Sequence, residues 1–409
     1  MGMMGNWVER WRSWPLYARI FGAILLGAAT GLALGSSAGG LALPAKLVLR
    51  LLGAIASPLV LVAIVRALLN AKLPRGTAPR LAFLLVLNTT VAILIGLAVA
   101  NLLQPGKWAQ VTPAASTAAA KALPGPLEQF LDNVPRSLLG PLTDDGKVLA
   151  VILIAVALGV ALRSWRDHPV KSAADLVEIA FGVLLQFLHW LVEIIPFAIF
   201  GVIASIVGTR GFADFLPLGA FVAAVVLALI LQGVWYLVRV RLGSWVNPWQ
   251  LVKGMCDALV MAFSTASSTA TMPVTYACLK DKVGLREQSA SLGALVGSNF
   301  NNDGTALYEA MSALFIAQVL GLDLSLQQQF MVVLTSIAAS VGAAGIPEAG
   351  LVTMMLVFKA VGLPVEYIAI LLTVDWFLDR CRTTINVMGD INVSALLDGR
   401  SRQTAQEKI

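Results

Sequence analysis

The chain has 409 residues, of which 58% are hydrophobic and only 13% are charged. A soluble domain carries about 25% charged residues, so this composition indicates a polytopic membrane protein and excludes an ordinary soluble one. The net charge of +6 does not indicate binding to nucleic acid, because the basic residues are divided among short gaps between apolar segments. The two histidines and three cysteines lack the spacing of a metal, haem or disulfide site, and no organic cofactor is expected.

The first part of the chain contains six apolar segments, namely residues 17–34, 45–69, 81–103, 127–162, 174–207 and 216–238. Each uninterrupted segment can cross about 30 Å of hydrocarbon as a helix. The gaps alternate in their content of Lys and Arg, and the richer gaps usually face the cytoplasm. This predicts a multi-pass protein of the plasma (inner) membrane with both termini in the cytoplasm. The first segment resembles a signal peptide, but the alternation stays in phase only if it remains as a transmembrane helix.

The next apolar segment, residues 251–280, is interrupted at its middle by a run of Ser and Thr that ends at Pro273. Basic residues lie at both of its ends, which predicts a re-entrant hairpin that enters from the cytoplasm and returns. Non-helical backbone at membrane depth is tolerated only where it lines a cavity or is buried in protein, so we expect the tip to contact a ligand. The alternative is that these hydroxyl groups only pack a helix interface.

Residues 289–321 form a second interrupted segment, whose break contains three amides, a carboxylate and a glycine: Asn299, Asn301, Asn302, Asp303 and Gly304. These residue types suit an unwound helix whose oxygen atoms bind a hard cation such as sodium. Glu309 lies one turn beyond Thr305 and therefore near the same site. We interpret Glu309 as a candidate proton carrier with Arg380 as its partner.

Residues 324–363 repeat the hairpin pattern with few cations at either end, and their middle, residues 340–350, is rich in Gly and small residues. This pattern predicts a second re-entrant hairpin, which enters from the outside. Two hairpins, each followed by a polar helix, form an inverted pair, residues 251–321 and 324–397. Such a pair predicts a binding site at the membrane midplane and alternating access.

The last apolar segment, residues 363–397, carries charged residues at its centre. At 100° per residue, six polar side chains fall on one face of this helix: Asp375, Asp379, Arg382, Thr383, Asn386 and Asp390. An unpaired ion at the bilayer centre costs roughly 2.5–3.5 kcal/mol, so this face must contact protein, water or a ligand. The structural alternative is an Asp379–Arg382 pair that only holds helices together.

Four stretches of the chain resemble the glutamate transporter family, the dicarboxylate/amino acid:cation symporters. They are SSTATMPVT (267–275), NDGTALYEAMSALFIAQ (302–318), GAAGIPEAGLVTM (342–354) and DWFLDRCRTTINVMGD (375–390). The resemblance implies an all-α homotrimer in the lipid bilayer, with eight transmembrane helices, two re-entrant hairpins, inverted repeats and an elevator-type movement. It assigns the scaffold to residues 1–80 and 105–210, the transport domain to 81–104, 211–245, 246–284, 285–322, 323–362 and 363–398, and a cytoplasmic tail to 399–409.

By motif position, the resemblance implies that Asp379 binds the ammonium group of an amino-acid substrate and Arg382 its side-chain carboxylate. A planar guanidinium matches a carboxylate through two parallel hydrogen bonds. The other implied substrate-binding residues are Thr383, Asn386, Ser267, Ser268, Thr305, Ile346 and Gly350. Relatives selective for neutral amino acids replace the arginine, so Arg382 favours an acidic substrate, L-aspartate or L-glutamate.

The same resemblance places sodium ions at three groups of oxygen atoms. They are those of Asp390, Asn386, Asn301 and Gly297; those of Asp303, Asn301 and Thr89; and the backbone of Asn299, Ser340, Val341 and Ala343. Asp390 favours sodium, because members driven by protons alone have Asn there. Asn299 and Asn302 depart from the usual Thr and Met, which leaves the ion stoichiometry open. Glu309 with Arg380 follows the animal transporters, in which proton cotransport and potassium countertransport accompany sodium.

The alternatives to this symporter are a carrier of C4-dicarboxylates, an anion channel and an enzyme. A proton-coupled carrier of C4-dicarboxylates is disfavoured by Asp379, because a buried carboxylate would repel a substrate that lacks an amine. A channel-like anion conductance is compatible with the family as a side activity. An enzyme is not indicated, since the sequence contains no nucleophile–base pair, metal cluster or nucleotide-binding loop.

Overall fold

The computed structural model describes residues 13–70, 78–108, 137–138, 140, 161, 170–212, 215–342 and 349–401. Within these ranges the chain is helical and forms no β-strand, in agreement with the predicted all-α fold. Most of the predicted segment 127–162 lies outside the described residues. The tip of the second hairpin, with Ala343, Ile346 and Glu348, also lies outside them.

The helices of the N-terminal part follow the predicted apolar segments closely. They are α2 (Leu16–Leu34), the 3-10 segment η1 (Gly35–Ala42), α3 (Leu43–Asn70), α4 (Ala78–Leu103), the 3-10 segment η2 (Pro105–Trp108), α7 (Ala173–Arg210) and α8 (Phe215–Gly243). Four helical stretches among the described residues are long and apolar enough to cross a membrane: Ala18–Ile55, Pro79–Trp108, Ala173–Thr209 and Phe215–Gly243. The first of these stretches continues from α2 through η1 into α3.

The C-terminal part is broken into shorter helices, as the polar interruptions predicted. They are α9 (Pro248–Gly254), α10 (Cys256–Thr265), α11 (Ser268–Ala277), η4 (Cys278–Val283), α12 (Glu287–Ser291), η5 (Leu292–Val296), α13 (Gly297–Phe300), α14 (Asp303–Val319), α15 (Leu326–Gly342), α16 (Ala349–Ala360), η6 (Val365–Tyr367) and α17 (Ile368–Asp398). The first hairpin breaks at Ala266, which adopts a left-handed conformation with φ 51°. The next predicted break falls at Asn301 and Asn302, between α13 and α14.

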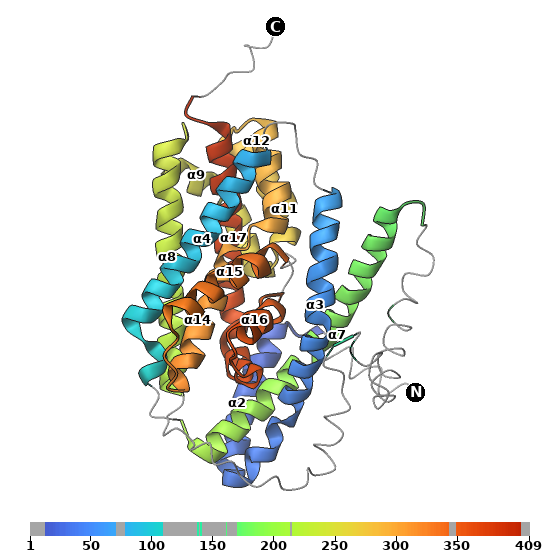
Figure 1. The fold of residues 1–409 in the computed structure, drawn as a ribbon, viewed down its shortest axis with the longest axis vertical. Helices are drawn as coiled ribbons and strands as arrows, with labels where there is room; N and C mark the ends of the chain where they lie inside the picture. Colours follow the sequence, from blue (N-terminus) through green and yellow to red (C-terminus); the bar gives the residue numbers. More distant parts are fainter. Residues whose placement is uncertain are drawn as a thin grey trace.

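The helices form two groups that lie side by side (Figure 1). In the smaller group α7 packs against α2 and α3, and in the larger group α14 packs against α4, α8, α15 and α17. The first group belongs to the predicted scaffold and the second to the predicted transport domain, and these functional roles stay predictions. Contacts of α16 with α3 and of α17 with α7 join the groups.

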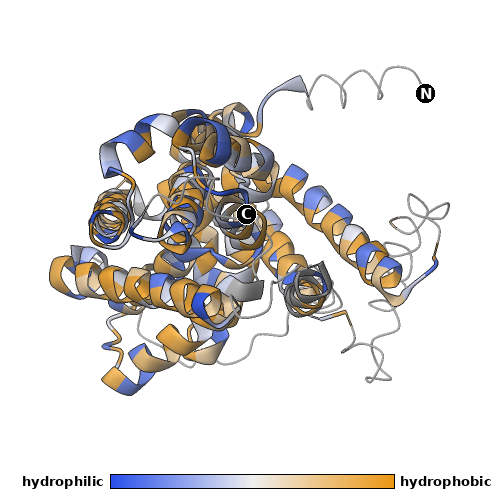
Figure 2. Cartoon of the chain, turned by 90° about the horizontal axis from the view of Figure 1, so that it is seen from above, coloured by the Kyte–Doolittle hydropathy of each residue, from blue (hydrophilic) through white to orange (hydrophobic). Residues whose placement is uncertain are grey.

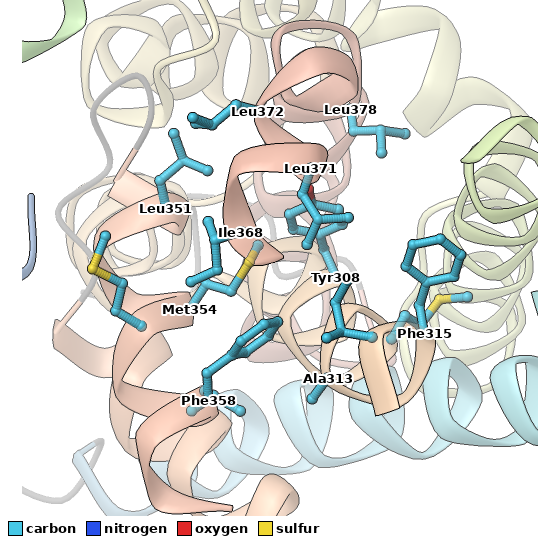
Figure 3. Close-up of a cluster of buried hydrophobic side chains, with 14 of the residues drawn as sticks. Tyr308, Ala313, Phe315, Leu351, Met354, Phe358, Ile368, Leu371, Leu372 and Leu378 are labelled. Atoms are coloured by element: carbon cyan, nitrogen blue, oxygen red, sulfur yellow. The ribbon is translucent and has the colours of Figure 1, made fainter. Parts of the chain in front are cut away.

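The core of the larger group is apolar where α14, α16 and α17 meet. Figure 3 shows Tyr308 and Phe315 from α14, Met354 and Phe358 from α16, and Leu371 from α17 within one apolar cluster. All five side chains are buried. Burial of this kind anchors the polar central turns of α17 to a rigid apolar base.

The long helices are apolar along most of their length, as the hydropathy colouring in Figure 2 shows, and many of their large apolar side chains are exposed. On α2 and α4, the side chains of Phe21, Leu26 and Phe83 are 57%, 65% and 64% exposed. Large apolar side chains exposed in such numbers are unfavourable in water and suit contact with lipid.

Helices α2 and α7 pack at close range through glycines. A Cβ atom added at Gly27 would lie 2.7 Å from the carbonyl oxygen of Phe200, and one added at Gly31 would lie 2.6 Å from that of Ala204. Small residues four positions apart allow two membrane helices to approach this closely. The glycines therefore determine the packing of the smaller group.

We expect Gly31→Ala to destabilise the protein by about 1–3 kcal/mol, because the added methyl group must push α7 away. Gly22→Ala is the matched control, since no atom lies within 4 Å of its added Cβ and alanine is the better helix former. The measurement is the thermal unfolding midpoint of the purified protein in detergent. Equal midpoints for the two variants would contradict the close packing.

Candidate functional site

The three polar segments predicted from the sequence meet in the larger helix group. Ser268 Oγ, at the tip of the first hairpin, donates to the Ser298 carbonyl oxygen on α13 at 3.2 Å. Asn301 Nδ2 donates to the Asn386 carbonyl oxygen of α17 at 3.0 Å. The tertiary fold thus brings the hairpin tip, the break between α13 and α14, and the polar face of α17 together.

Arg382 lies at the centre of this meeting point and is completely buried. Its Nη1 donates to Asp375 Oδ1 at 2.8 Å, and its Nη2 donates to Asp379 Oδ1 at 2.7 Å. The guanidinium carbon lies 4.1 Å from the centroid of the Tyr308 ring, a cation–π contact worth ~2 kcal/mol when desolvated. The charge is therefore compensated on its edges by two carboxylates and on its face by an aromatic ring.

Glycines let the backbones of neighbouring helices approach Arg382. A Cβ added at Gly304 would lie 2.6 Å from the Arg382 carbonyl oxygen, and one added at Gly350 would lie 3.3 Å from Nη2. Asn386 Oδ1 accepts a hydrogen bond from Gly304 N at 2.8 Å, which satisfies an N–H in the first turn of α14. Asn386 Nδ2 lies 3.3 Å from Thr305 Oγ1, so these predicted substrate-binding residues adjoin one another.

Asp303 forms a second polar centre at the N-terminus of α14 and is fully buried. Thr89 Oγ1 on α4 donates to Asp303 Oδ1 at 2.6 Å, and the Tyr236 hydroxyl on α8 donates to Asp303 Oδ2. A helix N-terminus favours a negative charge because its N–H groups point outward. The predicted proximity of Thr89 and Asp303 is thus present, and Tyr236 joins them.

Asp390 forms a third polar centre against α13. A Cβ added at Gly297 would collide with the Asp390 carboxylate, so only glycine fits at this position. Asp390 Oδ1 and Asn301 Oδ1 are both buried and accept no hydrogen bond from any residue that the structure describes. Buried oxygen atoms without donors suit a hard cation, and the donor set of carboxylate and amide oxygens fits sodium.

The described residues contain no cluster of three or more His, Cys, Asp or Glu side chains able to hold a metal ion.

The predicted pairing of Glu309 with Arg380 is absent from the structure, where the two side chains contact different helices. Glu309 on α14 is fully buried and accepts a hydrogen bond from the Thr353 hydroxyl on α16. Arg380 Nη1 donates to the carbonyl oxygens of Phe263 and Ser264 at 2.9 Å and 2.5 Å, at the end of α10. The reason is angular: Arg380 lies two residues before Arg382, about 200° away around α17, and therefore reaches the hairpin.

The remaining predicted residues lie around these centres. Ser267 Oγ accepts from Ala270 N at 3.1 Å and caps α11, whereas Thr383 is 4% exposed on the buried face of α17. Asn302 Nδ2 donates to the Ser340 carbonyl oxygen at 3.0 Å, and Asn299 Nδ2 donates to that of Leu295 at 3.0 Å. Val341 lies in the last turn of α15, while Ala343 and Ile346 lie outside the described residues.

Sequence reasoning missed four residues of this region: Asp375 as a partner of Arg382, Tyr308, Tyr236 and Thr353. Asp375 lies on the polar face of α17, but periodicity alone does not reveal that it pairs with Arg382, seven residues further along the chain. Tyr236 and Thr353 lie within apolar helices, where a lone hydroxyl is a weak signal. Their importance follows only from the carboxylates that they contact.

Comparison with known proteins identifies relatives over most of the chain. The model of the sodium:dicarboxylate symporter family matches residues 16–400. An excitatory amino acid transporter 1 from Ambystoma tigrinum is 37% identical over 264 residues, which cover 63% of this chain and 48% of the relative. An excitatory amino acid transporter 3 from Bos taurus is 35% identical over 277 residues, 66% of this chain and 52% of the relative. The aligned chain thus spans about half the length of these relatives.

We expect Asp375→Asn to lower the free energy of unfolding by about 1.5–3 kcal/mol, the range for a hydrogen bond to a charged group, because Arg382 then keeps one carboxylate only. The exposed Asp281, changed to Asn, is the matched control. Thermal unfolding in detergent measures both variants. A loss of stability that is the same for both would show that Asp375 does not stabilise the buried charge.

Proposed function

Because this chain belongs to the sodium:dicarboxylate symporter family, we propose that it is a secondary transporter that couples the uptake of acidic amino acids to sodium. The observation that carries the proposal is the buried guanidinium of Arg382, placed where the two interrupted segments and α17 meet. The printed names of the relatives, excitatory amino acid transporters, support an amino acid as the substrate.

The ion pairs of Arg382 suggest how the substrate binds. The substrate ammonium would pair with Asp379, which releases Nη2 of Arg382 for the side-chain carboxylate of the substrate. Asp375 would keep Nη1, so that the guanidinium is never left without a counter-charge. This exchange of partners keeps the guanidinium paired throughout. A buried charge left without a partner would cost several kcal/mol. An acidic amino acid supplies both the cation and the anion that this exchange requires.

Charge balance gives the reason for coupling to a cation. The buried carboxylates of this region outnumber its fully buried guanidinium, since Asp303 and Asp390 are buried and form no salt bridge with any residue that the structure describes. An acidic substrate brings one more negative charge. Sodium ions at Asp303 and Asp390 would offset that excess, so that substrate and cation enter the low-dielectric interior together.

The movement and assembly of the protein follow the same proposal. The larger helix group would carry the substrate past the smaller group of α2, α3 and α7, which would form the scaffold of a homotrimer in the plasma membrane with both termini cytoplasmic. Support comes from the division of the helices into two packing groups and from the exposed apolar side chains of α2. Proton cotransport would use Glu309, which is buried against Thr353, and potassium countertransport is a further element of the proposal.

A carrier of C4-dicarboxylates is the second candidate, and the description of the family, which names dicarboxylates, favours it. In that case Asp379 would remain on Arg382, and the substrate could use only the remaining N–H groups of the guanidinium, among them that of Nε. The experiment that separates the candidates is uptake into proteoliposomes of radiolabelled L-aspartate, L-glutamate and succinate under an inward sodium or an inward proton gradient.

We expect sodium-dependent uptake of L-aspartate or L-glutamate by the unmodified protein, and a loss of at least tenfold in Arg382→Cys. The matched control is Arg241→Cys, at an exposed position in the last turn of α8. Correct folding of Arg382→Cys is checked by size-exclusion chromatography. Retained uptake of acidic amino acids by a folded Arg382→Cys protein, or uptake of succinate alone by the unmodified protein, would refute the substrate assignment.

We expect Asp390→Asn to raise the sodium concentration needed for half-maximal uptake by about tenfold, because a neutral amide offers less charge to a cation. The control is Asp323→Asn, whose carboxylate is 89% exposed. The concentration dependence of uptake on external sodium measures both. An unchanged sodium dependence in Asp390→Asn would remove Asp390 from the cation site.

A further inference from the structure

A groove of about 440 Å³ opens on the surface at the end of the molecule where α4 begins and α8 and α17 end. These three helix ends lie together near the C-terminus, at the top of Figure 1. The groove is lined by the side chains of Arg80, Arg239 and Arg400 and by those of Leu84, Leu242 and Leu396. None of the described residues that line it is acidic, so the side chains of Arg80 and Arg400 lie beside apolar residues without a carboxylate in the groove.

Among the described residues, two arginines of the groove donate hydrogen bonds to neutral groups, and Arg239 also interacts electrostatically with the buried Asp303. Arg80 Nη2 donates to the Leu396 carbonyl oxygen at 2.7 Å, and Arg239 donates to the side-chain oxygen of Asn88. The structure records no ion pair for Arg80, Arg239 or Arg400 within the residues that it describes. A set of cations without carboxylates attracts an anion, because their mutual repulsion is otherwise uncompensated.

Hydrogen bonds from Trp245, which follows α8, hold the C-terminal end of α17 in place beside the groove. Trp245 N donates to the Gly399 carbonyl oxygen at 3.0 Å, and Trp245 Nε1 donates to Asp398 Oδ2 at 2.7 Å. Asp398, two residues before Arg400, forms an ion pair with Arg286 Nε at 2.9 Å. Its carboxylate is therefore paired outside the groove. Gly399, with φ 90°, then turns the chain so that Arg400 reaches the groove.

The surroundings of the groove are apolar and exposed. Leu242 and Val238 on α8 are 69% and 44% exposed, and Phe83 on α4 is 64% exposed. Apolar side chains below a cluster of arginines at helix ends mark the boundary between hydrocarbon and headgroups. A ligand that fits this boundary carries a negative charge at one end and hydrocarbon at the other, whereas a free inorganic anion would gain nothing from the apolar side.

We propose that the groove between the ends of α4, α8 and α17 binds an anionic phospholipid, whose phosphate contacts Arg80 and Arg400 and whose acyl chains lie along Phe83 and Leu242. The bound lipid bridges three helices that are distant in sequence and stabilises their common end. This site is separate from the Arg382 centre and does not depend on the transported substrate.

The test compares the binding of dioleoylphosphatidylglycerol with that of dioleoylphosphatidylcholine to the purified full-length protein in detergent, by native mass spectrometry. We expect the unmodified protein to prefer phosphatidylglycerol, and Arg80→Gln combined with Arg400→Gln to weaken its binding about tenfold or more. The matched control combines Arg241→Gln with Lys253→Gln, which removes two exposed cations near the same end outside the groove and should leave binding unchanged.

Arg80→Lys combined with Arg400→Lys retains the charge and should bind phosphatidylglycerol within about threefold of the unmodified protein, which separates loss of charge from loss of folding. Equal binding of the two lipids to the unmodified protein would overturn the proposal. An equal loss in the control variant would also overturn it, because the attraction would then be a general surface effect. Displacement of phosphatidylglycerol by inorganic phosphate at the same concentration would show a free-anion site instead of a lipid site.

Discussion

The placement of one permanent positive charge in a dry interior is the constraint on which the rest of this structure depends. Arg382 is completely buried in the middle of an apolar helix bundle, where an unpaired guanidinium would cost several kcal/mol. Asp375 and Asp379 meet the charge from the same helix, and the ring of Tyr308 meets it from α14. In the proposed transporter, a substrate that takes Asp379 away from Arg382 must supply a carboxylate in its place, so the site would favour molecules that carry both signs of charge.

A helix that breaks inside a membrane leaves backbone N–H and carbonyl groups without hydrogen-bond partners. In this structure, side-chain amides of asparagines form hydrogen bonds with such backbone groups at the breaks. Asn386 Oδ1 accepts from the backbone of Gly304, Asn301 donates to the carbonyl oxygen of Asn386, and Asn302 donates to that of Ser340. Asn301 and Asn386 are also among the residues proposed to bind sodium. In the proposed transporter, the same side chains would satisfy the backbone at the breaks and bind the cation.

The two helix groups are stabilised by different means. In the smaller group, glycines bring α2 and α7 into backbone contact, and ion pairs of Arg19 with Glu193 and of Arg66 with Glu178 fasten the helices at 2.7 Å and 2.6 Å. In the larger group, the polar breaks and the buried charge of α17 are enclosed by an apolar core (Figure 3). Each group thus has stabilising contacts of its own. The proposed elevator movement would require this of two groups that slide past each other.

The sequence alone determined where the helices lie, where they break and which face of α17 is polar, because these features depend on local composition and on a fixed rotation of 100° per residue. The predicted interruptions within residues 264–273 and 299–305, which the structure places at Ala266 and at Asn301, and the family itself were correct for that reason. The partners of buried charges were decided only by the tertiary structure. Periodicity tells which side a residue occupies but not which helix will face that side, and contacts such as Thr89 with Asp303 or Thr353 with Glu309 join residues far apart in the chain. The expected pairing of Glu309 with Arg380 failed on this point, since Arg380 points toward the hairpin and Glu309 toward α16.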